Sequence, residues 1–204
     1  EGIIEGAKIN ADPEIKVVVS DGVLVGTYLD GVAWLPGDAI TEGAHTFKAV
    51  AENIEQQQRV VEISFSLDKT PPIAVIDNGA LIQAATSKAI SISALQSTDN
   101  NKISSYSWSF SDTEQKYNGA TVWRTFATAG EYTVTLIVKD DHGNESQPVE
   151  ARIVVSDAPV IEISGVEHGG MYNQDLEVGI TVTNGAPTLI TLNANALSET
   201  SFTI

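Results

Sequence analysis

The chain of 204 residues is acidic, with 27 aspartates and glutamates against 11 lysines and arginines and a formal net charge of −16. A field of this sign repels nucleic acid and anionic lipid headgroups, so we expect neither as a partner. The absence of cysteine excludes disulfides and thiolate sites. No apolar run approaches the ~20 residues of a membrane span, so we expect no membrane insertion. The chain begins with Glu1, so we expect a piece of a longer protein.

Alternation of apolar and polar residues with a period of two dominates the sequence, and helical periodicity is nearly absent. The dipeptide Asp30-Gly31 separates two predicted strands and is typical of a two-residue type I′ hairpin. Short strands with frequent turn signals indicate β-sandwiches. The predicted fold class is therefore all-β, with tandem immunoglobulin-like β-sandwich modules of which the last is incomplete. The clearest predicted strands are residues 14–20, 24–29, 32–35, 89–93, 132–139 and 151–156.

Two proline-bearing seams divide the chain, at residues 67–72 (LDKTPP) and 156–159 (SDAP). Prolines cannot donate ladder hydrogen bonds and stiffen linkers. We therefore predict a module over residues 1–70 with its first strand missing, a second over 71–156, and the first half of a further repeat over 157–204.

An internal repeat links the two ends of the sequence. Residues 2–35 can be written over residues 165–198 without gaps, and self-similarity of this kind indicates an array of modules. The second copy also has a leading strand, residues 159–164, that the first lacks. We expect the chain to begin just after the first strand of one repeat and to end midway through another. Matched pairs include Gly2 with Gly165, Asn10 with Asn173, Asp12 with Asp175, Glu14 with Glu177, Val19 with Val182 and Gly22 with Gly185.

Three stretches of the middle segment carry a family resemblance: residues 104–110 (SSYSWSF), 130–136 (GEYTVTL) and 138–144 (VKDDHGN). On these stretches the segment resembles a PKD domain, an immunoglobulin-like fold named for polycystic kidney disease. The turn after Trp108 departs from the pattern, because residues 109–113 (SFSDT) stand where the family has Asp-Phe-Gly-Asp-Gly. We therefore expect a different turn geometry there.

The flanking segments resemble bacterial immunoglobulin-like domains, on residues 43–47 (GAHTF) and on the terminal 67–72. Tyr132 begins the strongest predicted strand, where a tyrosine corner would bond to upstream backbone. His45 occupies the like position in the first module, so we predict that it is a structural corner residue. The resemblances imply an extracellular or bacterial surface location.

No catalytic constellation is visible, and we predict that the chain is not an enzyme. Its histidines, His45, His142 and His168, fall in three different predicted modules. The Gly-x-Ser-x-Gly, His-Glu-x-x-His, P-loop and dinucleotide-binding motifs are all absent. Adjacent residues at a strand end point to opposite faces, so Asp140 and Asp141 do not suggest a glycosidase pair. We expect no required cofactor.

Calcium is the one ligand that the sequence suggests. In a sandwich of this order, the loop after the second strand and the loop after the sixth lie at one end, which would bring Asp99, Asn101 and Asp140 together. Oxygen atoms on loops are the ligands that calcium prefers. The PKD resemblance also implies a calcium site between these loops, next to the preceding module. The alternative is that these residues only form turns by bonding their own backbone.

The leading functional hypothesis is a non-catalytic extracellular spacer or interaction array within a larger surface or secreted bacterial protein. The alternative is an accessory module of a secreted hydrolase or adhesin that binds carbohydrate or protein. Such a module would expose aromatic rings, and the candidates are Tyr28, Trp34, Trp123 and Tyr172. We expect a core or inter-sheet position for both tryptophans. A third reading is a fragment of an enzyme whose catalytic domain lies outside this sequence.

Overall fold

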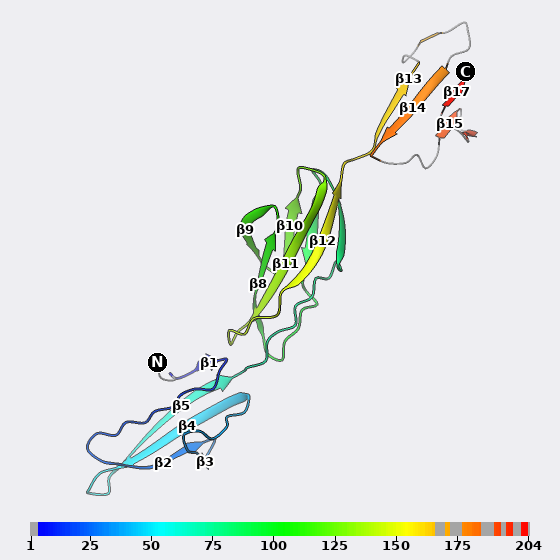
Figure 1. Ribbon diagram of the computed structural model, residues 1–204. Coiled ribbons are helices and arrows are strands. Elements are labelled where there is room, and N and C mark those ends of the chain that lie inside the picture. The colour runs from blue at the N-terminus through cyan, green and yellow to red at the C-terminus, as the bar shows by residue number, and fades with distance from the viewer. Residues whose placement is uncertain are drawn as a thin grey trace. The chain divides into compact units, whose positions relative to one another are not determined.

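The structure is a computed structural model that describes residues 4–165, 170–171, 177–184, 190–192, 195–197 and 201–203. Every regular element in these ranges is a β-strand (Figure 1), as the sequence predicts. The fold is all-β, built of immunoglobulin-like sandwich modules. Over these same ranges no helix has the length and apolar character to cross a membrane. His168 and Tyr172 lie outside the described residues.

The chain divides into two compact units. The first comprises Glu1–Asp77, Ser93–Val122 and Val134–Glu150, and the second comprises Asn78–Ile92, Trp123–Thr133 and Ala151–Ile204. The candidate site described below lies within the first unit.

The N-terminal segment forms a five-stranded sheet in the order β1-β5-β4-β2-β3. Strand β1 runs parallel to β5, with Ala7 opposite Phe65, and the other pairs are antiparallel. A small apolar core of Trp34, Ile40, Phe47, Phe65 and Leu67 covers one face of this sheet. The strands are β1 (Ala7–Ile9), β2 (Val23–Leu29), β3 (Val32–Ala33), β4 (Gly43–Glu52) and β5 (Gln58–Leu67).

The predicted hairpin at Asp30-Gly31 is confirmed. Both residues have positive φ, 51° for Asp30 and 82° for Gly31, as a type I′ turn requires at its two central positions. The turn joins β2 to β3, and Leu29 lies opposite Val32.

The prediction of a strand at residues 14–20 is wrong for the first module. Burial alternates along this segment as it does along a strand, and Ile15 and Val17 pack against the core. However, it belongs to no sheet in the described part of the chain. A strand exists only as part of a hydrogen-bonded ladder, and no described neighbour supplies one here.

The middle segment contains two sheets, ordered β6-β12-β11-β8-β9 and β10-β7. Trp108 on β8 is fully buried opposite Leu136 on β11, and its indole Nε1 donates to the Gly119 carbonyl at 2.9 Å. Trp108 therefore occupies a central position in the core of this segment. The strands are β6 (Leu81–Ala85), β7 (Ala89–Ser93), β8 (Ile103–Phe110), β9 (Thr113–Asn118), β10 (Thr121–Thr125), β11 (Gly130–Asp140) and β12 (Val149–Ser156).

Two corner residues occupy matching positions in successive modules. The Tyr132 hydroxyl donates to the Thr128 carbonyl at 2.9 Å, which is the tyrosine corner. His45 Nε2 lies 2.7 Å from the Thr41 carbonyl, and each contact spans four residues. His45 Nδ1 also lies 2.8 Å from Asp30 Oδ2, so the histidine ties the corner to the hairpin turn. The structural reading of His45 is confirmed.

The C-terminal segment contributes the sheet β13-β14-β17 and the separate hairpin β15-β16. Strand β13 lies at the edge of its sheet, and all five of its residues are exposed. The limits of the three predicted modules remain predictions. The strands are β13 (Val160–Ser164), β14 (Glu177–Thr183), β15 (Ile190–Leu192), β16 (Asn195–Leu197) and β17 (Ser201–Thr203).

The internal repeat has a structural counterpart at two points. Asp21 and Asn184, which occupy equivalent repeat positions, both have positive φ, 54° and 58°. The hairpin registers also coincide, since Leu29 pairs with Val32 and the equivalent Leu192 pairs with Asn195. Because non-glycine residues rarely adopt positive φ, the first coincidence is specific evidence that the backbone takes the same conformation at these two positions.

The two tryptophans on which the carbohydrate alternative depends differ in exposure. Trp34 is buried and meets Phe47 edge to face, with ring centroids 5.7 Å apart. Trp123 on β10 is 68% exposed, so the expected core position is wrong for this residue. The reason is strand alternation, because Val122 fills the buried face of β10 and its neighbour must then point outward.

Candidate functional site

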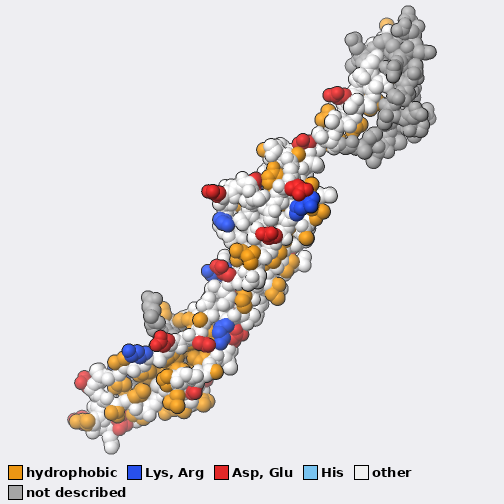
Figure 2. Space-filling view, in the orientation of Figure 1, with side chains coloured by type: hydrophobic (Ala, Val, Ile, Leu, Met, Phe, Trp, Pro, Cys, Tyr) orange, Lys and Arg blue, Asp and Glu red, His pale blue; other side chains and the backbone are white. Residues whose placement is uncertain are grey.

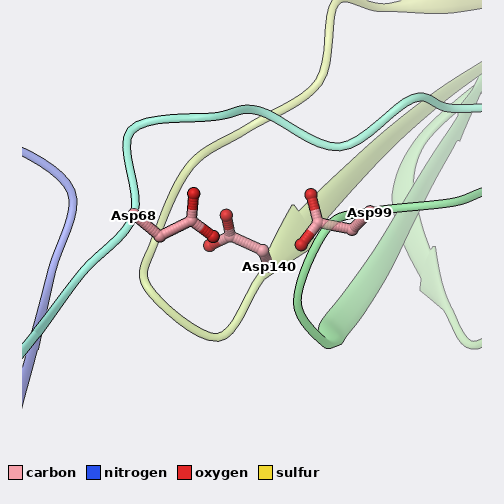
Figure 3. Close-up of side chains that lie close together, drawn as sticks. All are labelled: Asp68, Asp99 and Asp140. Atoms are coloured by element: carbon pink, nitrogen blue, oxygen red, sulfur yellow. The ribbon is translucent and has the colours of Figure 1, made fainter. Parts of the chain in front are cut away.

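Three carboxylates from distant parts of the sequence meet where β5 leads into the middle segment. Asp68 follows β5, Asp99 lies on the loop after β7, and Asp140 ends β11. One oxygen from each lies within 4.8 Å of the other two, and Figure 3 shows the carboxyl groups facing one another. The side chains of Asp68 and Asp140 are almost completely buried, at 0% and 1% exposure. We call these three residues the aspartate cluster.

Asp140 organises the loop that follows it. Its Oδ1 accepts the backbone N–H groups of His142, Gly143 and Asn144, at 2.8, 2.6 and 2.9 Å. Its Oδ2 accepts the Asn144 side-chain amide at 2.7 Å. Four donors on one carboxylate fix the loop conformation. Asp140 therefore makes the backbone contacts that the turn-forming alternative predicts.

Asp99 and Asn101 form a second such turn. Asp99 Oδ2 accepts the backbone N–H of Asn101 at 2.9 Å, while Asp99 Oδ1 is buried and has no hydrogen-bond partner. Asn101 directs its side-chain nitrogen to Asp68 Oδ2, at 2.5 Å. Of the three residues predicted from sequence, two carboxylates thus join the cluster, and Asn101 lies beside it as a donor. A buried polar oxygen without a partner is costly, so the turn alone does not account for Asp99.

Sequence reasoning missed Asp68. Its Oδ1 accepts from the backbone of Thr70 and from the side chain of Asn100, at 3.0 and 3.1 Å. Burial by itself would raise the pKa of Asp68, but the hydrogen bonds from Thr70, Asn101 and Asn100 outweigh it and lower the pKa. The available signal was the position of Asp68 within the seam at residues 67–72, three positions before the first of its two prolines.

Further contacts tie the loop after β11 to the end of the first sheet. The Asn144 side chain donates to the Asp68 carbonyl at 2.9 Å, in addition to its bond to Asp140. Lys8 on β1 forms an ion pair with Asp141. The hydrogen bond from Lys8 is the main reason that the pKa of Asp141 is lowered. A hydrogen bond to Asp68 and an ion pair between Lys8 and Asp141 therefore hold the loop after β11 against the end of the first sheet.

His142 lies between a serine and an aspartate, as the histidine of a Ser-His-Asp triad does. Its Nε2 lies 2.8 Å from Ser66 Oγ, and its Nδ1 lies 2.9 Å from Asp141 Oδ1 without forming a hydrogen bond to it. Catalysis also requires that a substrate reach the serine and that donors stabilise an oxyanion. The His142 side chain is 5% exposed, and Asp141 is already engaged by Lys8. These contacts therefore fit a locked junction better than an accessible nucleophile.

The charge balance of the aspartate cluster favours a cation. No lysine or arginine among the described residues forms an ion pair with any of its members. The nearest basic group recorded is His142 Nδ1, 3.8 Å from Asp68 Oδ2. Calcium binds oxygen ligands at about 2.3–2.6 Å, which suits oxygens that lie within 4.8 Å of one another. The three carboxylates and the unsatisfied Asp99 Oδ1 thus fit a hard divalent ion.

Comparison with solved structures identifies a fold of immunoglobulin-like modules. Solved structures with a similar fold include a three-immunoglobulin-domain fragment of titin, at 13% identity and TM-score 0.50, covering 89% of this chain and 72% of that one. The fibronectin(III)-like modules of Clostridium thermocellum CbhA are 19% identical at TM-score 0.46, with 76% of this chain and 91% of that chain covered. At these identities the likeness concerns the fold alone.

The family comparison is more specific for the middle of the chain. Residues 69–155 match the family model described as PKD domain, which confirms the resemblance of that segment. No curated protein sequence matches the chain. The aspartate cluster thus joins Asp68, the residue directly before the PKD match, to Asp99 and Asp140 within it.

Proposed function

We propose that the chain is a non-catalytic extracellular spacer array of a larger bacterial surface or secreted protein, and that calcium stiffens the junction before its PKD domain. The observation that carries the proposal is the aspartate cluster, which joins the linker residue Asp68 to Asp99 and Asp140 of the next domain. A cation there would hold both ends of the Lys69-Thr70-Pro71-Pro72 linker in one arrangement. A stiff spacer of this kind would hold a functional domain away from the cell surface.

Each member of the cluster would contribute carboxylate oxygen to the ion. Asp99 Oδ1 lacks any other partner, so it would gain most from coordination. Asn101 would supply its side-chain oxygen only after its amide turned, because the nitrogen now faces Asp68. Asp68 and Asp140 already bind donors that hold their carboxylates in place, which is the support that a metal ligand needs.

The test is thermal melting of the full chain in EDTA and in millimolar calcium. A ligand that binds only the folded state stabilises it by about 2.7 kcal/mol at a concentration of 100 Kd. We expect Tm to rise with calcium, and Asp99→Asn to abolish most of the rise because it keeps the turn acceptor but removes the charge. Asp157→Asn is the matched control, since Asp157 is exposed.

Two outcomes would contradict the calcium proposal. An unchanged Tm in calcium would leave the cluster as a turn-forming element only. A Tm rise that survives Asp99→Asn would place the ion elsewhere. Nuclear spin relaxation of each domain, with and without calcium, tests the stiffening separately, because a joined pair tumbles as one body and a flexible pair does not.

A second candidate function is carbohydrate binding at Trp123, favoured by its 68% exposure. Flat aromatic rings stack on sugar faces, and neighbouring Thr121 and Thr125 on the same exposed face of β10 offer hydroxyl groups. Retention on a panel of immobilised polysaccharides, compared between the chain and Trp123→Ala, tests it. Equal retention of the two proteins would remove this candidate.

A further inference from the structure

Glu42, the residue directly before β4, binds the first two residues of the linker. Its Oε1 accepts the Lys69 backbone N–H at 2.7 Å. The Thr70 hydroxyl lies 3.0 Å from each of the two Glu42 carboxylate oxygens and donates to them. One carboxylate of the first module therefore holds both residues that follow Asp68 in the chain.

The register of the first sheet explains why Glu42 lies at this point. Gly43, the first residue of β4, lies opposite the last residue of β5. Glu42 and Asp68 flank this pair, so both lie where the sheet ends. The loop that carries Glu42 is fixed in turn, because His45 contacts the Thr41 carbonyl at 2.7 Å.

Asp68 is the member of the aspartate cluster that this arrangement fixes. Its own N–H donates to the Ile9 carbonyl at 3.0 Å. The next N–H, of Lys69, donates to Glu42. The third, of Thr70, returns to Asp68 Oδ1 at 3.0 Å. Because this last bond holds the Asp68 carboxylate, the direction of that carboxylate depends on where residues 69–70 lie.

A surface ion pair adds to these contacts. The Lys69 Nζ lies 3.0 Å from Asp12 Oδ1, on the loop after β1. Figure 2 shows acidic and basic side chains next to one another on the surface at this end of the first sheet. Exposed pairs of this kind contribute little to stability. The contacts of Glu42 are therefore the ones that fix the linker backbone on this side.

We propose that Glu42 is a positioning residue for the ion of the aspartate cluster. By holding the two residues after Asp68, it directs the Asp68 carboxylate toward the other two aspartates before an ion arrives. This inference rests on the proposed function, because it concerns the support of that same site. Ligands that are ordered beforehand lose less entropy on binding, so such support raises affinity. Glu42 acts here through its hydrogen bonds, and its charge is not needed.

The first test needs no ion. Solvent exchange of single amides is measured by NMR in EDTA, on the full chain labelled with nitrogen-15. Glu42→Ala should speed exchange of the Lys69 and Thr70 N–H groups by about fivefold or more, because both lose their fixed arrangement. Glu42→Gln keeps an oxygen acceptor and should restore both rates. The Asp68 N–H, which bonds to β1, should keep its rate and show that the sheet is intact.

The Thr70 amide decides this first test. Its N–H donates to Asp68 Oδ1, so its exchange rate reports whether the Asp68 carboxylate is held. An unchanged Thr70 rate in Glu42→Ala would overturn the proposal, even if the Lys69 amide exchanged faster.

The second test uses calcium itself. Calorimetric titration of the full chain should give a Kd about fivefold higher for Glu42→Ala, with Glu42→Gln close to the unaltered protein. Glu55→Ala is the matched control, since it removes the same charge at an exposed position beyond the other end of β4. Equal Kd values for Glu42→Ala and the unaltered protein would contradict the proposal.

Two further results separate the possible failures. If Glu42→Gln weakens calcium binding as much as Glu42→Ala, Glu42 acts through its charge and the positioning role is wrong. If the unaltered chain binds no calcium, the proposed function fails, and the exchange rates in EDTA then decide by themselves whether Glu42 positions Asp68.

Discussion

Asn144 and Asp68 are 76 residues apart in the sequence, and the Asn144 side-chain amide donates to the Asp68 carbonyl at 2.9 Å. The same amide nitrogen donates to Asp140 Oδ2. One buried asparagine therefore joins the end of the first sheet to the loop of the next domain, beside the aspartate cluster. This hydrogen bond holds Asp68, at the start of the linker, against Asn144 in the loop after β11.

Replacement of Asn144 should destabilise the junction. Asn144→Ala leaves two buried acceptors without their donor, and each such loss costs about 1–3 kcal/mol. Urea unfolding, followed by a probe in each domain, should show a lower midpoint for the variant. Asn118→Ala, at an exposed position in β9, should change the midpoint little. An unchanged midpoint for Asn144→Ala would mean that water replaces both bonds.

The corner at His45 should stabilise the first module. His45→Phe keeps a flat ring but removes the contacts to Asp30 and to the Thr41 carbonyl. We expect a loss of about 1–3 kcal/mol, since a buried carbonyl and a carboxylate lose their partner. Tyr132→Phe removes the hydroxyl contacts to Thr128 in the next domain, on the surface of the protein, and should cost about 0.5–1.5 kcal/mol. Equal stability of His45→Phe and the unaltered protein in chemical denaturation would contradict the corner assignment.

The stability of the chain should fall in acid through Asp77. Burial by itself would raise the pKa of Asp77, but bonds from Ser93, Gln96 and Leu95 lower it in the folded state. A carboxyl whose folded pKa is lowered stabilises the fold above its unfolded pKa, and this contribution is lost as pH falls through the folded pKa. We therefore expect the loss below about pH 4. Asp77→Asn should flatten the pH dependence of the unfolding free energy in that range, and parallel curves for the two proteins would refute the prediction.

The two tryptophans should respond differently to truncation. Trp34→Ala opens a cavity beside Phe47 and should cost about 3–5 kcal/mol. Trp123→Ala removes an exposed ring and should stay within about 0.5 kcal/mol of the unaltered protein. Thermal unfolding of both variants checks this contrast. A large loss for Trp123→Ala would mean that the ring packs against something in the folded chain.

The Ser66-His142-Asp141 arrangement should be chemically inert. We expect no labelling of Ser66 by a fluorophosphonate probe, because the histidine that would activate it is enclosed at the junction. Mass spectrometry after prolonged incubation is the measurement, with a serine hydrolase as the positive control. Labelling that disappears in Ser66→Ala would make the junction a catalytic site and would overturn the non-catalytic proposal.

The sequence predicted the parts of the fold that depend on local pattern. Alternation located β7, β11 and β12, and Asp30-Gly31 fixed a type I′ hairpin because both residues tolerate positive φ. The pattern failed at residues 14–20, where the alternation of a strand is present without a partner to pair with. It also failed for Trp123, because an apolar residue says nothing about which face of its strand is covered.

The all-β class and the repeat could be predicted from the periodicity and spacing of residues along the chain. The PKD resemblance came from three stretches of sequence, and the nearness of Asp99 and Asp140 followed from the expected order of strands and loops. That Asp68 completes the cluster, that Asn101 faces it with its nitrogen and that Ser66 meets His142 became visible only in the folded chain. These contacts join residues separated by 31 positions, for Asp68 and Asp99, to 76 positions, for Ser66 and His142. They depend on how the first sheet contacts the loops of the next domain, and the local periodicity of a sequence does not determine such contacts.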